Sequence, residues 1–320
     1  MLSKKNILTL LNLPFVGRRT VSKINANTKG AFKNSNDYLN YFLHHSKSKR
    51  LHELKKSDVE CAEEKAREII KSSKSLGIRI VGENEKGFPG RLKLIPDAPV
   101  VIFVKGDLKI LDSSMVIGVV GTRQPTMPAR KIASSIGKYL ADKKVILVSG
   151  LALGCDAESQ LGCVNNKGKT VAVLAHGLDT ISPKKNISLA EKILSLGGCW
   201  ISEYPVGIAP EANTFVERNR IQSGLSDAII VIETGKSGGT MKTVEFSQKQ
   251  NRPVFCVKPQ PSSNKSRVAS GNAMLIKSGR AQCINNLKDI ELIVKNLSKK
   301  NNTACVDPIL QGDSQMNLDF

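Results

Sequence analysis

The sequence has few aromatic residues and no long apolar run. Phenylalanine, tyrosine and tryptophan together make up 4% of its 320 residues, and there is one tryptophan. A long platform of stacked aromatic side chains is therefore excluded. The longest nearly apolar stretches, residues 115–120 and 145–154, fall far short of the roughly 20 residues that a bilayer-spanning helix needs. No small-residue cleavage site follows the apolar N-terminal stretch, so we expect a cytoplasmic protein with no membrane partner.

The sequence lacks the cysteine and histidine spacings that bind metals. The seven cysteines are an odd number with no CxxC pair, and the four histidines form no HExxH motif. These spacings argue against a disulfide framework, a structural zinc site and a metalloenzyme. We expect buried, reduced thiols, and neither a metal nor a cofactor.

Positive charge is in excess. The chain has 48 Lys and Arg against 28 Asp and Glu, a formal net charge of +20. Residues 1–80 hold 17 of the basic and 7 of the acidic side chains, which is a net +10 and half of the excess. A basic chain of this kind is typical of proteins that bind a polyanion, because each phosphate contact releases a counterion. Lysine-rich solvated surfaces explain the same numbers equally well.

The pattern of the chain changes twice and predicts three segments. Residues 1–75 are polar and helical, and we assign them to a small helical domain of the helix-hairpin-helix or SAM-like kind. The longest predicted helix covers residues 58–73, with Asp58 as a candidate cap. Residues 13–20 have the look of a helix-hairpin-helix turn, in which glycine lets the backbone bend and free amides meet a phosphate, although a purely structural turn fits as well. Residues 76–298 form the second segment, and residues 299–320 a flexible acidic tail.

The second segment alternates short apolar strands with amphipathic helices. This alternation predicts an α/β fold: an extended Rossmann-like, doubly wound, mostly parallel sheet covered by helices on both faces. The expected strands cover residues 78–82, 116–120, 145–148, 170–174, 200–202, 228–232 and 253–257. The expected helices cover residues 127–142, 156–165, 187–196 and 240–250, and residues 259–270 are expected to form a loop.

Four clusters of glycine or arginine follow the expected strands. They cover residues 121–123, 149–156, 215–220 and 234–242. Ligands of parallel sheets collect beyond the carboxyl ends of the strands, so we expect these clusters to form one cationic, phosphate-binding groove. The candidate DNA-binding residues are Gly121, Thr122, Arg123, Ser149, Gly150, Phe215, Arg218, Asn219, Arg220, Lys236, Ser237, Gly238, Gly239 and Lys242.

Over residues 76–259 the sequence resembles the DNA-processing family DprA/Smf. The motifs that carry the resemblance occur in order, at residues 88–92, 96–99, 119–123, 149–156, 170–179, 202–210, 218–226 and 236–245. The resemblance implies a homodimer without catalytic activity that binds and protects single-stranded DNA and loads RecA on incoming strands during natural transformation. By position, Arg123, Phe215, Arg218, Asn219 and Arg220 match the family's phosphate- and base-contacting motifs.

Two other functions remain open for the same broad fold. Nucleoside-monophosphate phosphoribohydrolases carry a glycine-rich loop that residues 238–240 and Glu245 resemble in part, and Arg218 and Glu245 would then be catalytic. A nucleotide-sensing protein would bind a mononucleotide at the same edge of the sheet. Neither alternative explains the net positive charge or the basic N-terminal segment.

For several residues in these motifs, a structural role is the alternative to a functional one. Asp156 and Asp179 are more typical of groups that brace loops than of acid–base catalysts, and His176 is typical of a turn. Two arginines that flank an asparagine are a common structural clamp. We therefore expect one of Arg218 and Arg220 to face DNA and the other to face the protein.

The C-terminal residues suggest a short docking peptide. Gln315, Leu318 and Phe320 lie on an acidic segment with the spacing of peptides that bind the sliding clamp of the bacterial replisome. An unstructured end without a partner is the alternative.

Overall fold

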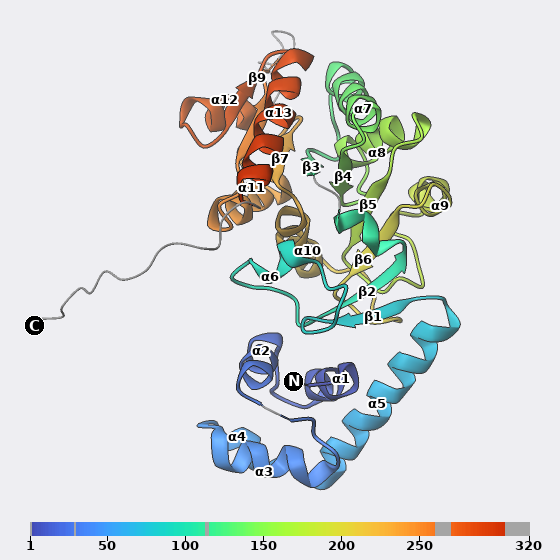
Figure 1. The fold of residues 1–320 in the computed structure, drawn as a ribbon, viewed down its shortest axis with the longest axis vertical. Coiled ribbons are helices and arrows are strands. Elements are labelled where there is room, and N and C mark those ends of the chain that lie inside the picture. Colours follow the sequence, from blue (N-terminus) through green and yellow to red (C-terminus); the bar gives the residue numbers. More distant parts are fainter. Residues whose placement is uncertain (1, 29, 113–114, 260–269, 305–320) are drawn as a thin grey trace, which may run out of the picture.

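The computed structural model describes residues 2–28, 30–112, 115–259 and 270–304. They form a helical N-terminal domain, drawn in blue in Figure 1, and a larger α/β domain that lies beside it. The predicted fold class is confirmed. Within the described part of the chain, every helix is too short or too polar to span a lipid bilayer.

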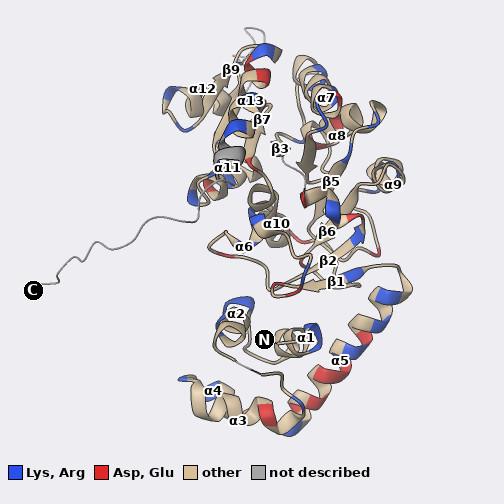
Figure 2. Ribbon diagram, viewed as in Figure 1, with Lys and Arg blue, Asp and Glu red and all other residues tan. Residues whose placement is uncertain are grey.

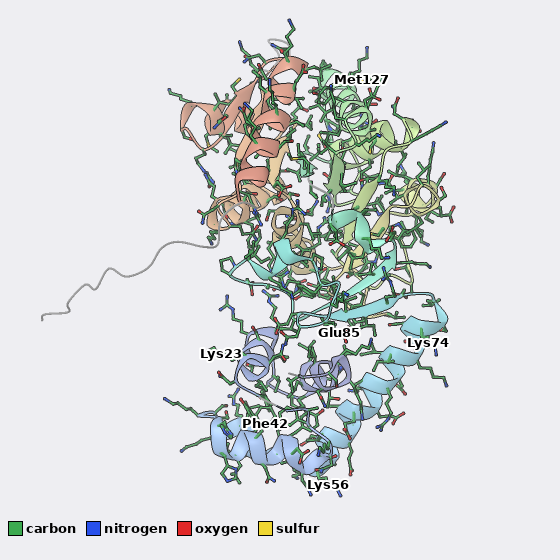
Figure 3. The ribbon with its side chains drawn as sticks, in the orientation of Figure 1. Lys23, Phe42, Lys56, Lys74, Glu85 and Met127 are labelled. Carbon is green, nitrogen blue, oxygen red and sulfur yellow. The ribbon has the colours of Figure 1, made fainter. Side chains whose placement is uncertain are left out.

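The N-terminal domain is a cluster of amphipathic helices. Their inward side chains, among them Ile7, Val21, Tyr38, Phe42 and Val59, are almost completely buried in one core that continues into the adjoining edge of the sheet (Figure 3). The helices are α1 (Lys4–Asn12), α2 (Arg18–Asn27), α3 (Ser35–His45), α4 (Lys49–His52) and α5 (Lys56–Ser75).

The longest of these helices does not begin as predicted. Lys55, not Asp58, is the N-cap residue of α5, and the Asp58 carboxylate accepts a hydrogen bond from the Lys55 backbone N–H at 2.8 Å. The predicted cap therefore lies three residues inside the helix. It still satisfies one free amide there and places a negative charge in the first turn, where the helix dipole favours it.

One nine-stranded sheet forms the α/β domain. The strands run in the order β1-β2-β6-β5-β4-β3-β7-β8-β9; β1–β2 and β2–β6 are antiparallel and the other pairs are parallel. The strands are β1 (Arg79–Gly82), β2 (Val101–Gly106), β3 (Val116–Val120), β4 (Ile146–Ser149), β5 (Thr170–Leu174), β6 (Cys199–Ser202), β7 (Ala228–Val231), β8 (Val254–Val257) and β9 (Gln282–Ile284).

Helices cover both faces of this sheet. The cores on one face include side chains of α7 (Met127–Asp142), α8 (Cys155–Asn165), α9 (Ile187–Ser195) and α13 (Leu287–Ala304). The cores on the other face include α6 (Gly90–Lys93), α10 (Ala212–Leu225), α11 (Gly239–Lys249) and α12 (Ser270–Lys277). Because both faces are covered, the central strands are buried throughout, as their continuous apolar sequence predicts.

The order of the strands reverses between β3 and β7. From β3 the chain builds outward through β4, β5 and β6, and then returns to place β7 against the other side of β3. The helices that follow β3 and β7 therefore lie on opposite faces, and the loops at the carboxyl ends of these two strands diverge. Such a reversal leaves a crevice in which α/β proteins bind their ligands.

Most predicted elements are present, with ends that shift by one or two residues. The helices predicted above do not include α6, α10, α12 or α13, although α10 spans fourteen residues, and the strands predicted do not include β2 or β9. α13 also continues to Ala304, so the tail predicted from residue 299 is helical in its first part. Residues 260–269, within the predicted loop, lie outside the described residues.

Candidate functional site

A hollow of about 590 Å³ lies at the strand-order reversal. We call it the switch pocket. It is lined by residues from the end of β3, the loop after β7, α10, the first half of α11 and the start of α8 with the loop before it. Its lining consists of Val120, Gly121, Thr122, Arg123, Ala152, Asp156, Pro210, Glu211, Ala212, Phe215, Val216, Arg218, Asn219, Gln222, Thr234, Gly235, Ser237, Gly238, Gly239, Thr240 and Thr243.

Arg218 is the buried cation of the switch pocket. Its side chain reaches from α10 to the ends of β4 and β5, where the guanidinium donates to the backbone oxygens of Gly150, at 2.9 Å, and Val173. It also donates to Asn219 Oδ1 at 3.2 Å. No described carboxylate lies within 4 Å of it. Arg218 is thus held by neutral acceptors in a pocket where its charge has no ion-pair partner.

Burial changes the pKa of this group. Loss of hydration lowers the pKa of Arg218 to about 10. The positive charge of Arg123 lowers this pKa further, and the negative charge of Asp156 raises it in part. The guanidinium therefore stays charged at neutral pH, at a cost in solvation. An anion that enters the pocket would offset this cost, so the geometry favours a negatively charged ligand.

Gly150 allows this arrangement. The Gly150 carbonyl is one of the acceptors of Arg218, and a Cβ at this position would collide with the guanidinium. A glycine in a strand-to-helix turn is thus required here by the arginine that packs on it. Ser149 is fully buried and donates to the Val119 carbonyl at 2.7 Å, so it positions the turn and offers no group to a ligand.

Phe215 stands between two arginines in the pocket. The Arg123 guanidinium lies 4.9 Å from the centre of its ring, and that of Arg218 lies 6.0 Å away. The three side chains come from α10 and from the loop after β3, and their juxtaposition joins an aromatic face to two cations. Proteins that bind single-stranded nucleic acids use this combination, because bases stack on the aromatic ring and guanidinium groups contact the phosphates.

The first turn of α11 supplies a different kind of donor. Gly238 precedes this helix with φ +109°, a conformation that favours glycine, and the helix then begins at Gly239 in the pocket wall. Asn219 Nδ2 donates to the Gly239 carbonyl at 3.1 Å and fixes α11 against α10. The free amides of the first helical turn therefore add neutral anion-binding groups beside the arginines.

The two acidic groups of the lining limit its charge. Asp156 is buried, its carboxylate accepts from the Gly150 N–H at 3.0 Å, and burial raises its pKa. Glu211 precedes α10 at the mouth of the pocket. Against Arg123 and Arg218 these carboxyl groups leave a lining that is close to neutral when all four are ionised. The expected cationic groove is therefore wrong for the pocket taken alone; Lys and Arg are distributed over both domains (Figure 2).

Nine of the predicted DNA-binding residues line the switch pocket and five do not. Those in the lining are Gly121, Thr122, Arg123, Phe215, Arg218, Asn219, Ser237, Gly238 and Gly239. Ser149 and Gly150 lie behind Arg218, as described above. Lys236 and Lys242 are exposed outside the lining, and Lys242 pairs with Glu245 at 3.0 Å. Arg220 belongs to a different site.

Arg220 joins the two domains. Its guanidinium is 1% exposed, donates to both carboxylate oxygens of Glu203 at 2.7 Å and lies 3.3 Å from Asp97. Arg18, on α2, donates to Asp97 at 2.7 Å and to Glu217 at 2.8 Å. We call these five residues the interdomain cluster. Its two cations and three carboxylates anchor α2 to α10.

The two arginines of α10 have different surroundings, whereas the expectation that one of them faces DNA stays a prediction. Arg220 faces carboxylates of the protein, and Arg218 lines the pocket. Sequence reasoning missed Arg18, Asp97, Gln222 and Thr243 as parts of these two sites. Asp97 lies within a quoted motif, but nothing in the local sequence shows that its partner comes from a helix 79 residues earlier.

Other expected roles are clear in the structure. Asp156 braces the loop before α8 as described, and Asp179 accepts from the Gly207 N–H at 3.1 Å, so both carboxylates support loops as predicted. His176 is buried, its Nδ1 lies 2.8 Å from the Gly177 oxygen, and burial lowers its pKa. Glu245 lies outside the switch pocket, so the pair Arg218 and Glu245 is not brought together as a catalytic site.

The N-terminal turn differs from its prediction. Gly17 precedes α2 with φ −101°, whereas the left-handed residue of the turn is Phe15, at φ +64°. The bend assigned to glycine is therefore made two residues earlier by an exposed phenylalanine, and the Arg50 guanidinium lies 5.5 Å from the centre of its ring.

The cysteines of the described chain are unpaired. Cys155, Cys163, Cys199 and Cys256 are buried, which raises the pKa of each thiol. Cys61 is exposed and Cys283 half-buried, so the expectation of burial is wrong for these two. Among the described residues, no three His, Cys, Asp or Glu side chains lie close enough together to hold a metal ion.

Comparison with known proteins places this geometry in a family. The sequence model of DNA recombination-mediator protein A matches residues 79–295. DNA processing protein DprA of Bacillus subtilis is 34% identical over 235 residues, which cover 73% of this chain and 77% of that protein. Protein Smf of Synechocystis is 38% identical over 199 residues, or 61% of this chain and 49% of the relative, so the chain spans about half of that protein.

Two solved structures have the same fold. DNA processing protein A from Streptococcus pneumoniae matches with a TM-score of 0.74 and 24% identity, over 91% of this chain and 97% of that one. The protein from Helicobacter pylori, described for its single-stranded DNA binding mode, matches with a TM-score of 0.62 and 27% identity, over 68% of this chain and 96% of that one. With the matched motifs gathered around one crevice, the chain belongs to the DNA recombination-mediator protein A family.

Proposed function

We propose that the chain binds single-stranded DNA in the switch pocket. The observation that carries this proposal is Arg218, a buried guanidinium with no ion-pair partner in the described structure, at the base of a pocket that also presents Phe215 and the first turn of α11. A phosphate would supply the missing anion, and a base would stack on the aromatic ring without being identified. The Helicobacter pylori relative, whose structure is described for single-stranded DNA binding, supports the same ligand.

The finer role follows from the family. We propose that the protein acts without catalysis, as a homodimeric mediator that protects incoming single strands and loads RecA on them during natural transformation. The name of the family and the DNA-processing names of the relatives support this role. RecA-dependent strand exchange on oligonucleotides coated with a single-strand-binding protein tests it; no stimulation by this protein would contradict RecA loading.

Binding of labelled oligo-dT, measured by fluorescence anisotropy, tests the DNA site. Arg123→Ala removes an exposed cation beside Phe215, and we expect about tenfold weaker binding. The matched control is Arg79→Ala, which removes an exposed arginine from the edge strand β1. Equal affinities of the two variants would place the DNA elsewhere.

The enzymatic alternative has a direct test. A phosphoribohydrolase would release free base from AMP or a related nucleotide, and chromatography would detect it. We expect none, because Glu245 is paired with Lys242 outside the pocket. Tight binding of a mononucleotide, measured by calorimetry, would instead favour nucleotide sensing.

The clamp hypothesis concerns residues outside the described structure. Gln315, Leu318 and Phe320 all lie there, so docking of this peptide on the sliding clamp stays a prediction. A pull-down with purified clamp compares the full chain with one that lacks residues 315–320. Equal retention of the two would exclude the peptide as the docking site.

A further inference from the structure

A second hollow lies next to the interdomain cluster. It has a volume of about 460 Å³ and lies between α2 of the N-terminal domain and the end of α11. We call it the α2–α11 hollow. Its lining consists of Arg18, Arg19, Ser22, Lys23, Pro96, Asp97, Ala98, Arg220, Phe246, Lys249 and Gln250.

The cations of this hollow fall into two groups. Arg18 and Arg220 are neutralised within the interdomain cluster, which holds three carboxylates. Arg19, Lys23 and Lys249 are exposed, and within the described chain none of them has a carboxylate within 4 Å (Figure 3 labels Lys23). Three unpaired cations around one hollow create a positive potential that is absent from the nearly neutral lining of the switch pocket.

An aromatic side chain accompanies these cations. Phe246 lines the hollow from α11, is partly exposed, and has no ring or cation partner among the described residues. Lys249 follows it by three residues on the same helix, so the ring and the ammonium share one face. Proteins that bind single-stranded nucleic acids without sequence preference combine aromatic side chains with nearby cations in this way.

α11 connects the two hollows. Gly239, Thr240 and Thr243, in its first half, line the switch pocket, whereas Phe246 and Lys249, in its second half, line the α2–α11 hollow. The centres of these two sets are about 10 Å apart along the helix axis at 1.5 Å per residue. α11 is therefore the element of structure that both hollows share.

We propose that the α2–α11 hollow, through Arg19, Lys23, Phe246 and Lys249, binds the continuation of a single strand whose adjoining nucleotides occupy the switch pocket. This inference rests on the proposed function of that pocket. It gives the basic N-terminal domain a direct part in holding the polymer, and it predicts that affinity depends on strand length more than the switch pocket alone would require.

The test compares two lengths of oligo-dT, of about 5 and about 15 nucleotides, since single-strand sites span about 4–16 nucleotides. In the triple variant Arg19→Ala, Lys23→Ala, Lys249→Ala we expect about tenfold or greater loss of affinity for the longer oligonucleotide and little loss for the shorter one. The slope of log affinity against log salt for the longer one should fall by about 2, because each lost phosphate contact accounts for about 0.7.

The control removes the same number of charges from another face. Lys65→Ala, Lys71→Ala, Lys74→Ala acts on exposed lysines of α5, and Figure 3 shows Lys74 near the end of that helix. We expect this variant to keep the full salt slope. Equal slopes for the two triple variants would overturn the proposal.

A substitution without loss of charge separates stacking from electrostatics. Phe246→Leu keeps an apolar side chain in the hollow and removes the ring, and we expect about threefold or greater weakening for the longer oligonucleotide alone. Full affinity of both this variant and the Arg19, Lys23, Lys249 triple variant, with the wild-type protein still binding, would leave the switch pocket as the site and exclude the hollow. If the wild-type protein bound neither length, the proposed function itself would fail and this inference with it.

Discussion

Arg218 and Arg220 lie two residues apart on α10 and are both buried, yet their surroundings differ completely. Arg220 faces two carboxylates and anchors the N-terminal domain, whereas Arg218 faces carbonyl oxygens and lines the switch pocket. Residues two apart on a helix point in nearly opposite directions, so the same helix serves both purposes. The comparison teaches that an arginine is a candidate for ligand binding when its charge is unpaired, whatever its sequence motif.

The largest effect is expected at the paired arginine. Arg220→Met leaves Glu203, whose side chain is 11% exposed, without its bidentate partner and with only Arg18 at 3.9 Å, and we expect a loss of about 3 kcal/mol in the free energy of unfolding. Denaturant titration measures it. Affinity of the folded variant for an oligo-dT of about 5 nucleotides, which the switch pocket alone would hold, should change little. A large loss of this binding with unchanged stability would reverse the roles assigned to the two arginines.

The other arginine should have a different balance of effects. Arg218→Met removes the donor to the Gly150 and Val173 carbonyls and a cation that favours ionised Asp156, so stability should fall by about 1–2 kcal/mol, while binding of oligo-dT should weaken by about 2 kcal/mol. Anisotropy and denaturant titration on the same sample measure the two quantities. Strong binding by the folded variant would contradict the switch pocket as the DNA site.

The interdomain cluster also predicts a pH dependence. Burial alone would raise the pKa of Asp97, but the hydrogen bond from Arg18 and the charges of Arg220, Arg18 and Arg19 outweigh it and hold this pKa below the usual value. The stabilisation is therefore complete above about pH 4, the ordinary pKa of an aspartate, and is lost as the pH falls through the lower pKa of folded Asp97.

Arg18→Met checks this dependence. We expect it to cost about 1 kcal/mol at neutral pH, because its partners are partly exposed, and progressively less at acid pH. Urea titrations at several pH values measure the difference from the wild-type protein. A difference that stayed constant down to the acid range would mean that Asp97 does not carry the link.

The smallest effect is expected at Lys242. Its pair with Glu245 is exposed and spans one helical turn, so Lys242→Ala should change stability by less than about 0.5 kcal/mol. Binding of oligo-dT should also be nearly unchanged, because Lys242 lies outside both hollows. A clear loss of affinity would extend the DNA path over the outer face of α11.

The sequence predicted the parallel core because its strands are continuous apolar runs. It failed for β9, which has three residues and an exposed Gln282, and for β2, although residues 101–104 are a continuous apolar run. β9 forms one edge of the sheet and β2 lies next to the other edge, where pairing with neighbours, and not local pattern, fixes the structure.

The sequence predicts many of the residues of the candidate site, but it does not predict which of its arginines form ion pairs. Glycine and arginine after β3 and before α11 identify the rim of the sheet, because parallel strands end there. Which arginine of α10 is neutralised depends on Asp97 and Glu203, which are distant in sequence and meet only in the folded chain. The α2–α11 hollow depends in the same way on how two domains dock.

The length of α11 sets the spacing of everything along it. Its eleven residues span roughly 16 Å, and its opposite ends reach two separate hollows. On the proposed DNA path, α11 therefore sets the distance between the switch pocket and Lys249. Inserting one extra turn would shift the second set of proposed contacts relative to the first, so the helix, and not either hollow, would set the spacing between the nucleotides bound at its two ends.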